Sequence, residues 1–364
     1  MAFFNIDKDS VKLLIKYFFI SKAIVVIGIL FSIFIMGIDI KSIFFNFDAT
    51  HYINIAINGY TRSYQYAFFP LYPLLIRLFS VLGVPYVVSG VLISNLLHIA
   101  SGLILLVLNN KYLKQKEEAL LLVFFLSFNS VFFSSVYTES LFLFLTLLSF
   151  TLYKNKNWIL SGILLGLSVA TRNIGSLLFF AIFIELLINK EKFLNIIKMY
   201  IPATIISLIY PIYLYIYTGN FFKFASVQKE CWGAEFTNPL SAIIRDIKVF
   251  FLSKQPIFSI VVIFSFISIY IALYLIVKNF KKENIALIIY MLLGVLVPLL
   301  SSKIFSFDTL TGMPSTTSLF RYIFALFPIY IFSSKISNIK WYLRIHVIIG
   351  LILSIAYYSN VFIA

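Results

Sequence analysis

The chain has 364 residues, of which 61% are hydrophobic and only 12% are charged, and 41 of them are phenylalanine. So little polar surface cannot cover a soluble domain of this size, which excludes an ordinary soluble enzyme or binding module. The net charge of +15 fits basic loops on the cytoplasmic side of a membrane better than a nucleic-acid surface. The single cysteine, Cys231, excludes an intramolecular disulfide, and the three histidines leave little material for a metal centre.

Apolar stretches long enough to cross a membrane recur from end to end and predict an all-α polytopic membrane protein. We expect about eleven transmembrane helices, at residues 17–38, 86–108, 118–134, 137–153, 158–171, 174–189, 200–218, 256–277, 284–300, 319–334 and 341–360. The first should remain as a span, because its apolar core is too long for a signal peptide and no small-residue cleavage pattern follows it. No soluble domain or internal repeat divides the chain, so we expect a single integral membrane domain over residues 1–364.

Lysine and arginine give the orientation. If the N-terminus is cytoplasmic, each cytoplasmic segment is short and carries two or three basic residues, as the positive-inside bias requires. The C-terminus and three longer segments, 39–85, 219–255 and 301–318, then lie on the extracytoplasmic side. The motifs whose side chains could take part in a reaction fall in these segments or beside them, so we expect an extracytoplasmic active site.

Residues 48–58 read as a short helix lying in the membrane interface. At 100° per residue, Asp48, His51, Asn54 and Asn58 share one face, and Gly59 stops the helix. A charged carboxylate beside a membrane span costs free energy, so its presence there has to be explained. One interpretation is an acid that caps the helix or complements its dipole, and the other is a general base reachable by a lipid-linked and a polar substrate.

The next motif is Ala67-Phe68-Phe69-Pro70-Leu71-Tyr72-Pro73, followed by Arg77. Two prolines three residues apart fix a rigid turn, and a second interfacial helix should follow and end near 83–85. Arg77 is a candidate for binding a phosphate. Its alternative role is to extend toward lipid headgroups.

Glu139 and Arg172 are further candidates for the site. Tyr137-Thr138-Glu139-Ser140 opens a span at its outer end, and Thr171-Arg172-Asn173 is a tight outer turn. Arg172 is costly there unless it meets an anion or an acid. Phosphate recognition and a purely structural Glu139–Arg172 pair remain open.

The outer segment 219–255 places Phe224, Gln228 and Trp232 four residues apart, on one face of a helix that could stack on a sugar or rest on the membrane. Arg321 and Tyr322 add a cation beside an aromatic ring, which could bind substrate or anchor the interface. His98 and His346 lie within spans, where we expect hydrogen bonds between helices.

Taken together, these motifs resemble the PIG-V family of mannosyltransferases, members of the GT-C class of multi-span glycosyltransferases. The resemblance covers most of the chain and rests on the order and spacing of several short motifs: Phe47-Asp48-Ala49-Thr50-His51-Tyr52, Ala67 to Arg77, Tyr137 to Phe142, Ala170 to Gly175, Gln228 with Trp232-Gly233, and Arg321-Tyr322 with Phe327-Pro328. The family usually has Arg-Trp before the aspartate, where this chain has Asn46-Phe47.

The resemblance implies a GT-C-like bundle that transfers mannose from a polyprenyl-phosphate or dolichyl-phosphate donor to a glycolipid or cell-envelope glycan, with no nucleotide and no obligatory metal. Asp48 would be the base, assisted by His51. The donor and its phosphate would be bound by residues of the outer face: Arg77, Glu139, Arg172, Gln228, Trp232, Arg321 and Tyr322. The Ile-, Lys- and Asn-rich composition favours the cytoplasmic membrane of a prokaryote over the endoplasmic reticulum.

Two alternatives remain at this stage. The same fold could transfer another lipid-linked sugar, which nothing in the sequence excludes. A lipid or solute transporter is the competing class, and it predicts charges near the bilayer midplane and broken helices in related halves. The motifs here lie at the outer boundary, so we favour the transferase.

Overall fold

The computed structural model describes residues 6–301, 313–336 and 338–361. These ranges are all-helical and contain no β-strand, as the sequence predicts. Within them, six helical stretches are long and apolar enough to cross a membrane. Four are single helices, α1 (Lys8–Phe34), α9 (Phe193–Thr218), α12 (Pro256–Lys278) and α16 (Ile339–Tyr358). The other two are Tyr86–Leu113, which is α4 (Tyr86–Leu108) with the turn that follows it, and Lys282–Leu300, which is α13 (Ile285–Leu300) with the turn that precedes it. This confirms a multi-pass membrane architecture, whereas the count of eleven spans stays a prediction.

Three shorter helices complete the bundle: α6 (Glu139–Lys154), which is buried along most of its length, α7 (Trp158–Thr171) and α8 (Gly175–Ile188). They coincide with expected spans. Helix α7 packs closely on α9 because Gly162 lets the two backbones meet. A Cβ atom there would lie 2.0 Å from the carbonyl oxygen of Met199, so only glycine fits.

Two expected spans are not continuous helices. The stretch 118–134 consists of α5 (Glu117–Phe125) and a 3₁₀ turn, η3 (Phe128–Val131), and 319–334 consists of α14 (Leu319–Ile323) and α15 (Pro328–Ser333). Ser127 accepts a hydrogen bond from the backbone of Asn129, and Pro328 cannot continue the preceding helix. Both segments are buried within the protein, where broken helices are tolerated at membrane depth.

The helices expected at residues 48–58, after Pro70 and around 224–232 are present. The first segment contains α2 (Asp48–Asn58), the 3₁₀ turn η1 (Ser63–Ala67) and α3 (Leu71–Val81), and the second contains α10 (Lys223–Trp232) and α11 (Pro239–Leu252), an additional helix that was not predicted. Their place in the membrane interface stays a prediction. Helix α2 has the predicted bounds, and Gly59 follows it with a φ of 72°. Most of the third segment, residues 302–312, lies outside the described residues.

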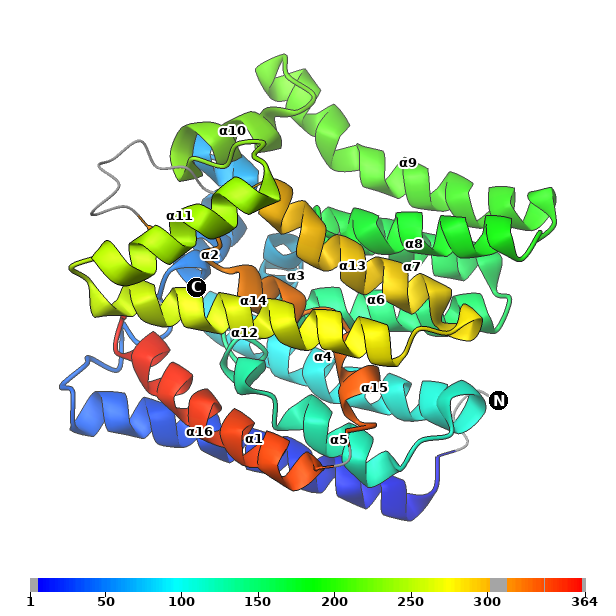
Figure 1. Cartoon of the computed structure of the whole chain (residues 1–364). Coiled ribbons are helices and arrows are strands. Elements are labelled where there is room, and N and C mark those ends of the chain that lie inside the picture. Colours follow the sequence, from blue (N-terminus) through cyan, green and yellow to red (C-terminus); the bar gives the residue numbers. More distant parts are fainter. Residues whose placement is uncertain (1–5, 302–312, 337, 362–364) are drawn as a thin grey trace.

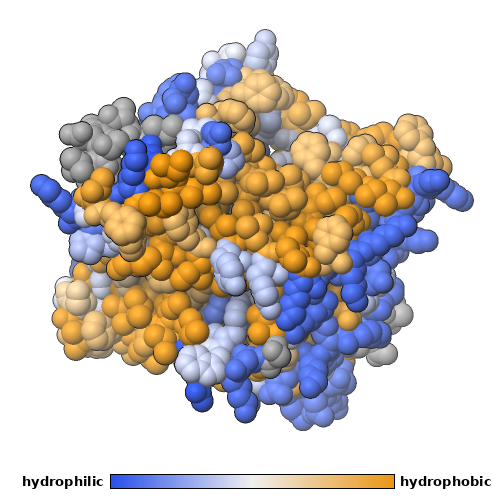
Figure 2. All heavy atoms as spheres, viewed as in Figure 1, coloured by the Kyte–Doolittle hydropathy of each residue, from blue (hydrophilic) through white to orange (hydrophobic). Residues whose placement is uncertain are grey.

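The two ends of the bundle differ. Figure 1 shows α2, α10 and α11 together at one end, while the start of α1 lies at the other. Figure 2 shows a broad hydrophobic face between them, with hydrophilic side chains gathered toward the end that holds the N-terminus. The helices α1 and α16 lie side by side along one edge of the bundle. The candidate site is at the end formed by α2, α10 and α11.

Both buried histidines join segments, as predicted. His98 of α4 lies 3.0 Å from Lys22 Nζ of α1, and His346 of α16 accepts a hydrogen bond of 3.3 Å from the backbone of Phe128. These two contacts give both histidines a structural role, so no catalytic role has to be assumed for them.

Candidate active site

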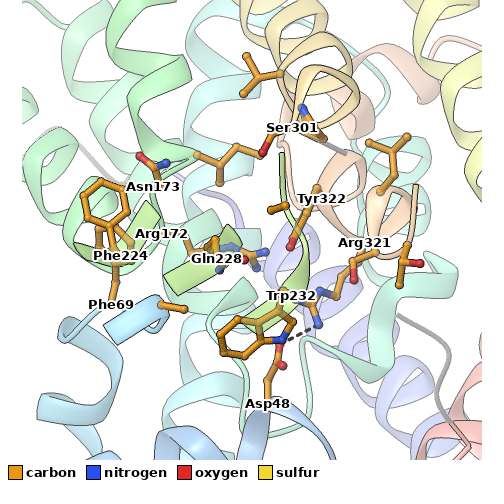
Figure 3. A pocket seen from close by; sticks show the side chains of 18 of the residues that line it. Asp48, Phe69, Arg172, Asn173, Phe224, Gln228, Trp232, Ser301, Arg321 and Tyr322 are labelled. Carbon is orange, nitrogen blue, oxygen red and sulfur yellow. Dashed lines mark ion pairs between the residues drawn. The ribbon is translucent and has the colours of Figure 1, made fainter. Parts of the chain in front are cut away.

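A cavity of about 690 Å³ opens at this end of the bundle. Its walls come from α2, α10, the turn between α7 and α8, the end of α13, and the segment 313–322. Six of the predicted residues line it: Asp48, Arg172, Gln228, Trp232, Arg321 and Tyr322. Figure 3 shows Asp48, Trp232 and Arg321 close to one another, with Phe69, Phe224 and Asn173 on another side of the cavity.

The charged residues form a chain of ion pairs. Arg321 Nη1 lies 3.0 Å from Asp48 Oδ2, and Arg321 Nε lies 3.1 Å from Glu139 Oε1. The same Glu139 oxygen lies 2.5 Å from Arg172 Nη1. Two acids therefore balance two arginines, and Glu139 bridges both guanidinium groups.

Burial divides these four groups. The side chain of Glu139 is 0% exposed and those of Arg321 and Arg172 are 8% and 10% exposed, whereas Asp48 is 28% exposed. Glu139 does not line the cavity and lies behind the two arginines with which it is paired. Of the two carboxylates in these ion pairs, Asp48 is the one that lines the cavity.

Aromatic rings enclose the two cations. Tyr322 lies between them, with its ring centre 5.1 Å from Arg172 Cζ and 5.5 Å from Arg321 Cζ. Arg321 also lies 5.2 Å from the ring of Tyr137. Such cation–π contacts stabilise guanidinium groups that have lost water, and they fix the direction in which each group points.

The local backbone presents Asp48 to the cavity. Phe47 has a φ of 51°, which is costly for a residue with a side chain, and α2 begins directly after it. The neighbouring Asn46 is buried and donates a hydrogen bond of 2.8 Å to the carbonyl of Tyr357 at the end of α16. Asp48 is a first-turn acid, and its side chain pairs with Arg321 rather than capping the helix.

Helix α10 supplies the aromatic wall. Gln228 and Trp232 line the cavity, and Gly233 ends the helix with a φ of 63°. Trp232 packs edge-on against Phe68, with ring centres 5.8 Å apart. The predicted helical face of α10 is therefore turned toward the cavity.

His51 packs against Phe68, as Trp232 does, and it does not line the cavity. Its ring centre lies 4.7 Å from that of Phe68 and 5.4 Å from that of Tyr64, and no hydrogen bond joins it to Asp48 in the described ranges. Burial lowers the pKa of His51, and the negative charge of Asp48 partly opposes this effect. The geometry thus gives His51 a packing contact with Phe68, and its relation to Asp48 is electrostatic only.

Arg77 is the predicted residue that the structure keeps apart from the others. It lies on the exposed side of α3 and is not among the residues that line the cavity. Its position fits the alternative of an arginine that extends toward headgroups.

Sequence reasoning missed Asp246 and the segment Ser315–Ser318. The four hydroxyl-bearing residues of that segment line the cavity, and Asp246 of α11 is fully buried behind them. One feature of the sequence could have identified Asp246. It shares a helical face with Ala242 and Val249, where an apolar residue is expected. Burial raises the pKa of Asp246, and hydrogen bonds from Thr316 and Ser315 oppose that increase.

Within the described ranges, no group of three or more His, Cys, Asp or Glu side chains is placed to hold a metal ion. The polar groups of the cavity are one carboxylate, two arginines, amides and hydroxyls. Such a set can bind a phosphate, orient a sugar and accept a proton.

Comparison with known proteins agrees with this chemistry. Residues 39–217 match the family model described as Mannosyltransferase (PIG-V). The chain carries a PIG-V mannosyltransferase family domain over these residues. Its activity is therefore glycosyl transfer. The matched segment contains Asp48, Glu139 and Arg172, whereas α10 and Arg321 lie beyond it. No curated protein and no solved structure matches the chain.

Proposed function

We propose that this protein transfers mannose from a polyprenyl-phosphate-linked donor to a hydroxyl of a glycolipid or cell-envelope glycan, on the extracytoplasmic side of a prokaryotic cytoplasmic membrane. The observation that carries the proposal is one cavity in which a reachable carboxylate, Asp48, lies beside two arginines, Arg172 and Arg321. A lipid-linked sugar phosphate needs that combination of groups, and a nucleotide sugar is not required.

The arginines act on the leaving group. In the donor, the phosphate is a diester with one negative charge, and after transfer the polyprenyl phosphate carries a charge of about −1.5 to −2. Arg172 and Arg321 meet this growing charge in a site with little water, so they stabilise the transition state more than the ground state. Because a phosphate leaves without protonation, the site needs no strong acid.

Asp48 acts on the acceptor. As the acceptor hydroxyl attacks the anomeric carbon, the new C–O bond forms while the bond to the phosphate oxygen breaks. Asp48 accepts the proton of that hydroxyl, as a positioned general base does. A single displacement of this kind inverts the anomeric configuration.

The Arg321–Asp48 ion pair describes the site before the donor binds. A donor phosphate competes with Asp48 for the guanidinium group of Arg321, because both are anions that accept the same N–H donors. Binding of the donor thus releases the Asp48 carboxylate for the acceptor hydroxyl. Glu139 keeps both arginines in place throughout, as a positioning residue that does not contact the substrate.

Trp232 and Gln228 complete the site. An indole face binds the apolar side of a sugar ring, and an amide side chain both donates and accepts hydrogen bonds with sugar hydroxyls. Their place on one turn of α10, next to Asp48, suits them to hold the transferred sugar.

The test is a transfer assay with the full chain in lipid nanodiscs, radiolabelled polyprenyl-phosphate mannose and a lipid extract of membranes as the source of acceptor. We expect label in a new glycolipid or glycan, and digestion with α- and β-mannosidases to show inversion relative to the donor. Transfer only from a different polyprenyl-phosphate sugar would overturn the choice of mannose. Donor movement across the bilayer without transfer would favour a transporter.

A further inference from the structure

Asp246 makes an unusual set of contacts for an acid on an amphipathic helix. It is 0% exposed on the inner face of α11, and its oxygens accept hydrogen bonds from the backbone N–H groups of Ser315 (2.5 Å) and Thr316 (3.0 Å). The hydroxyl of Thr316 donates a third, short hydrogen bond. A buried carboxylate is costly without such partners, so these contacts hold α11 and the segment 315–316 together.

The segment that Asp246 binds, residues 315–318, forms one wall of the cavity. Ser315, Thr316, Thr317 and Ser318 all line it and are 3–4% exposed. The hydroxyl of Ser265 on α12 donates a hydrogen bond of 3.1 Å to the carbonyl of Thr316, which holds the segment from a second side. Asp246 supplies acceptors to the N–H groups of this stretch and Ser265 supplies a donor to its carbonyl.

The same segment leads directly into the helix that carries Arg321. The carbonyl of Thr316 accepts a hydrogen bond of 2.9 Å from Leu319 N, the first residue of α14. Ser318 has a φ of 72°, a conformation that L-residues rarely adopt, so it must be held by its surroundings. A shift at 315–316 would therefore change the start of α14, only a few residues before Arg321.

We propose that Asp246 is a positioning residue of the transfer reaction, because it fixes the Ser315–Ser318 wall of the cavity and, through it, the start of the helix on which Arg321 lies. Its assignment to sugar transfer rests on the proposed function above. The hydrogen bonds that join Asp246 to residues 315 and 316 do not depend on that function, and their effect on the segment can be measured without any substrate.

A matched control is available at the opposite end of the bundle. Glu185 is also a buried acid, 3% exposed, and it accepts hydrogen bonds from a backbone N–H, that of Ala286 (2.8 Å), and from Tyr153 (2.9 Å). Glu185 also forms an ion pair with Lys154 (2.6 Å), and neither it nor the partners named here line the cavity. Loss of either acid should destabilise the protein, and only loss of Asp246 should change the kinetics of the folded enzyme.

The experiment compares Asp246→Asn with Glu185→Gln in two measurements. Hydrogen–deuterium exchange should accelerate at least tenfold in peptides covering 313–318 for Asp246→Asn, and stay unchanged there for Glu185→Gln. In the transfer assay, corrected for the folded fraction, kcat/KM for the donor should fall at least tenfold for Asp246→Asn, with a higher KM, and stay within twofold for Glu185→Gln. Thr316→Val, which keeps the carboxylate and removes one donor, should fall in between.

Unchanged exchange at 313–318, or unchanged kcat and KM per folded molecule in both Asp246→Asn and Thr316→Val, would overturn the assignment. If Asp246→Asn does not fold, Thr316→Val decides alone. If the wild-type chain transfers no mannose, the proposed function fails, and the exchange measurement still decides whether Asp246 holds the wall.

Discussion

Arg321 binds Asp48 and Glu139 at once, through two different nitrogen atoms of one guanidinium group. The two acids lie on separate helices, α2 and α6, and differ in exposure, 28% for Asp48 and 0% for Glu139. This relationship separates a carboxylate that lines the cavity from one that does not. The predictions below test this division.

Replacement of Asp48 by asparagine should abolish transfer while the protein still inserts and folds. The amide cannot accept the acceptor's proton, and loss of a general base costs about 10²–10⁴-fold in rate. The measurement is initial rate per folded molecule. Asp39→Asn, which changes an exposed acid of the same segment 39–85, is the matched control and should retain full activity. An active Asp48→Asn enzyme would rule out the base assignment.

Replacement of Arg172 by alanine should raise the donor KM and lower kcat, because in the proposed reaction Arg172 binds the donor phosphate both before and during its departure. We expect a loss of about 10²–10³-fold in kcat/KM, the range for removal of one preorganised donor. Arg344→Ala, an exposed arginine of α16, should change neither constant. Equal donor kinetics in Arg172→Ala would leave Arg172 with only its structural pair to Glu139.

Arg77→Ala separates the two roles proposed for Arg77. Since Arg77 is exposed and lies outside the cavity lining, we expect kcat/KM for the donor to change less than twofold. A loss comparable to that of Arg172→Ala would place the donor phosphate on α3 instead. The measurement is the same donor titration in nanodiscs.

Replacement of Glu139 by glutamine should destabilise the fold, because it leaves two buried arginines with one acid between them. Removing one partner of a buried ion pair costs about 3–5 kcal/mol. Thermal unfolding in detergent measures the change. The exposed pair Lys12–Asp9 provides the comparison, and Asp9→Asn should leave the melting temperature unchanged. A Glu139→Gln protein as stable as the wild type would show that the bridge contributes nothing.

His51 should make stability depend on pH. Its pKa in the folded protein lies below the ordinary value of 6.5, so the unfolded chain takes up a proton first as the pH falls. Stability from His51 is therefore complete above about pH 6.5 and decreases as the pH drops below it. His51→Phe keeps the packing on Phe68 and should flatten this dependence, with less than a tenfold loss of transfer. A complete loss of transfer would instead support a direct role in catalysis.

The sequence determined the local elements of the site. Helix α2 has the bounds that its polar face and Gly59 indicate, and α10 carries Gln228 and Trp232 on one face as their spacing requires. Helical periodicity and glycine conformation act over a few residues, so they can be read from the chain alone. The family resemblance also follows from such short motifs, and it is confirmed for residues 39–217.

Only the tertiary structure decided which charges meet. No local pattern pairs Arg321 with Asp48, places Glu139 between two arginines, or keeps Arg77 outside the cavity. The same holds for the broken segment 319–334 and for Asp246, whose burial looks unfavourable until Ser315 and Thr316 supply their N–H groups. The physical reason is that a buried charge or an interrupted helix is stable only with partners, and those partners come from distant parts of the chain.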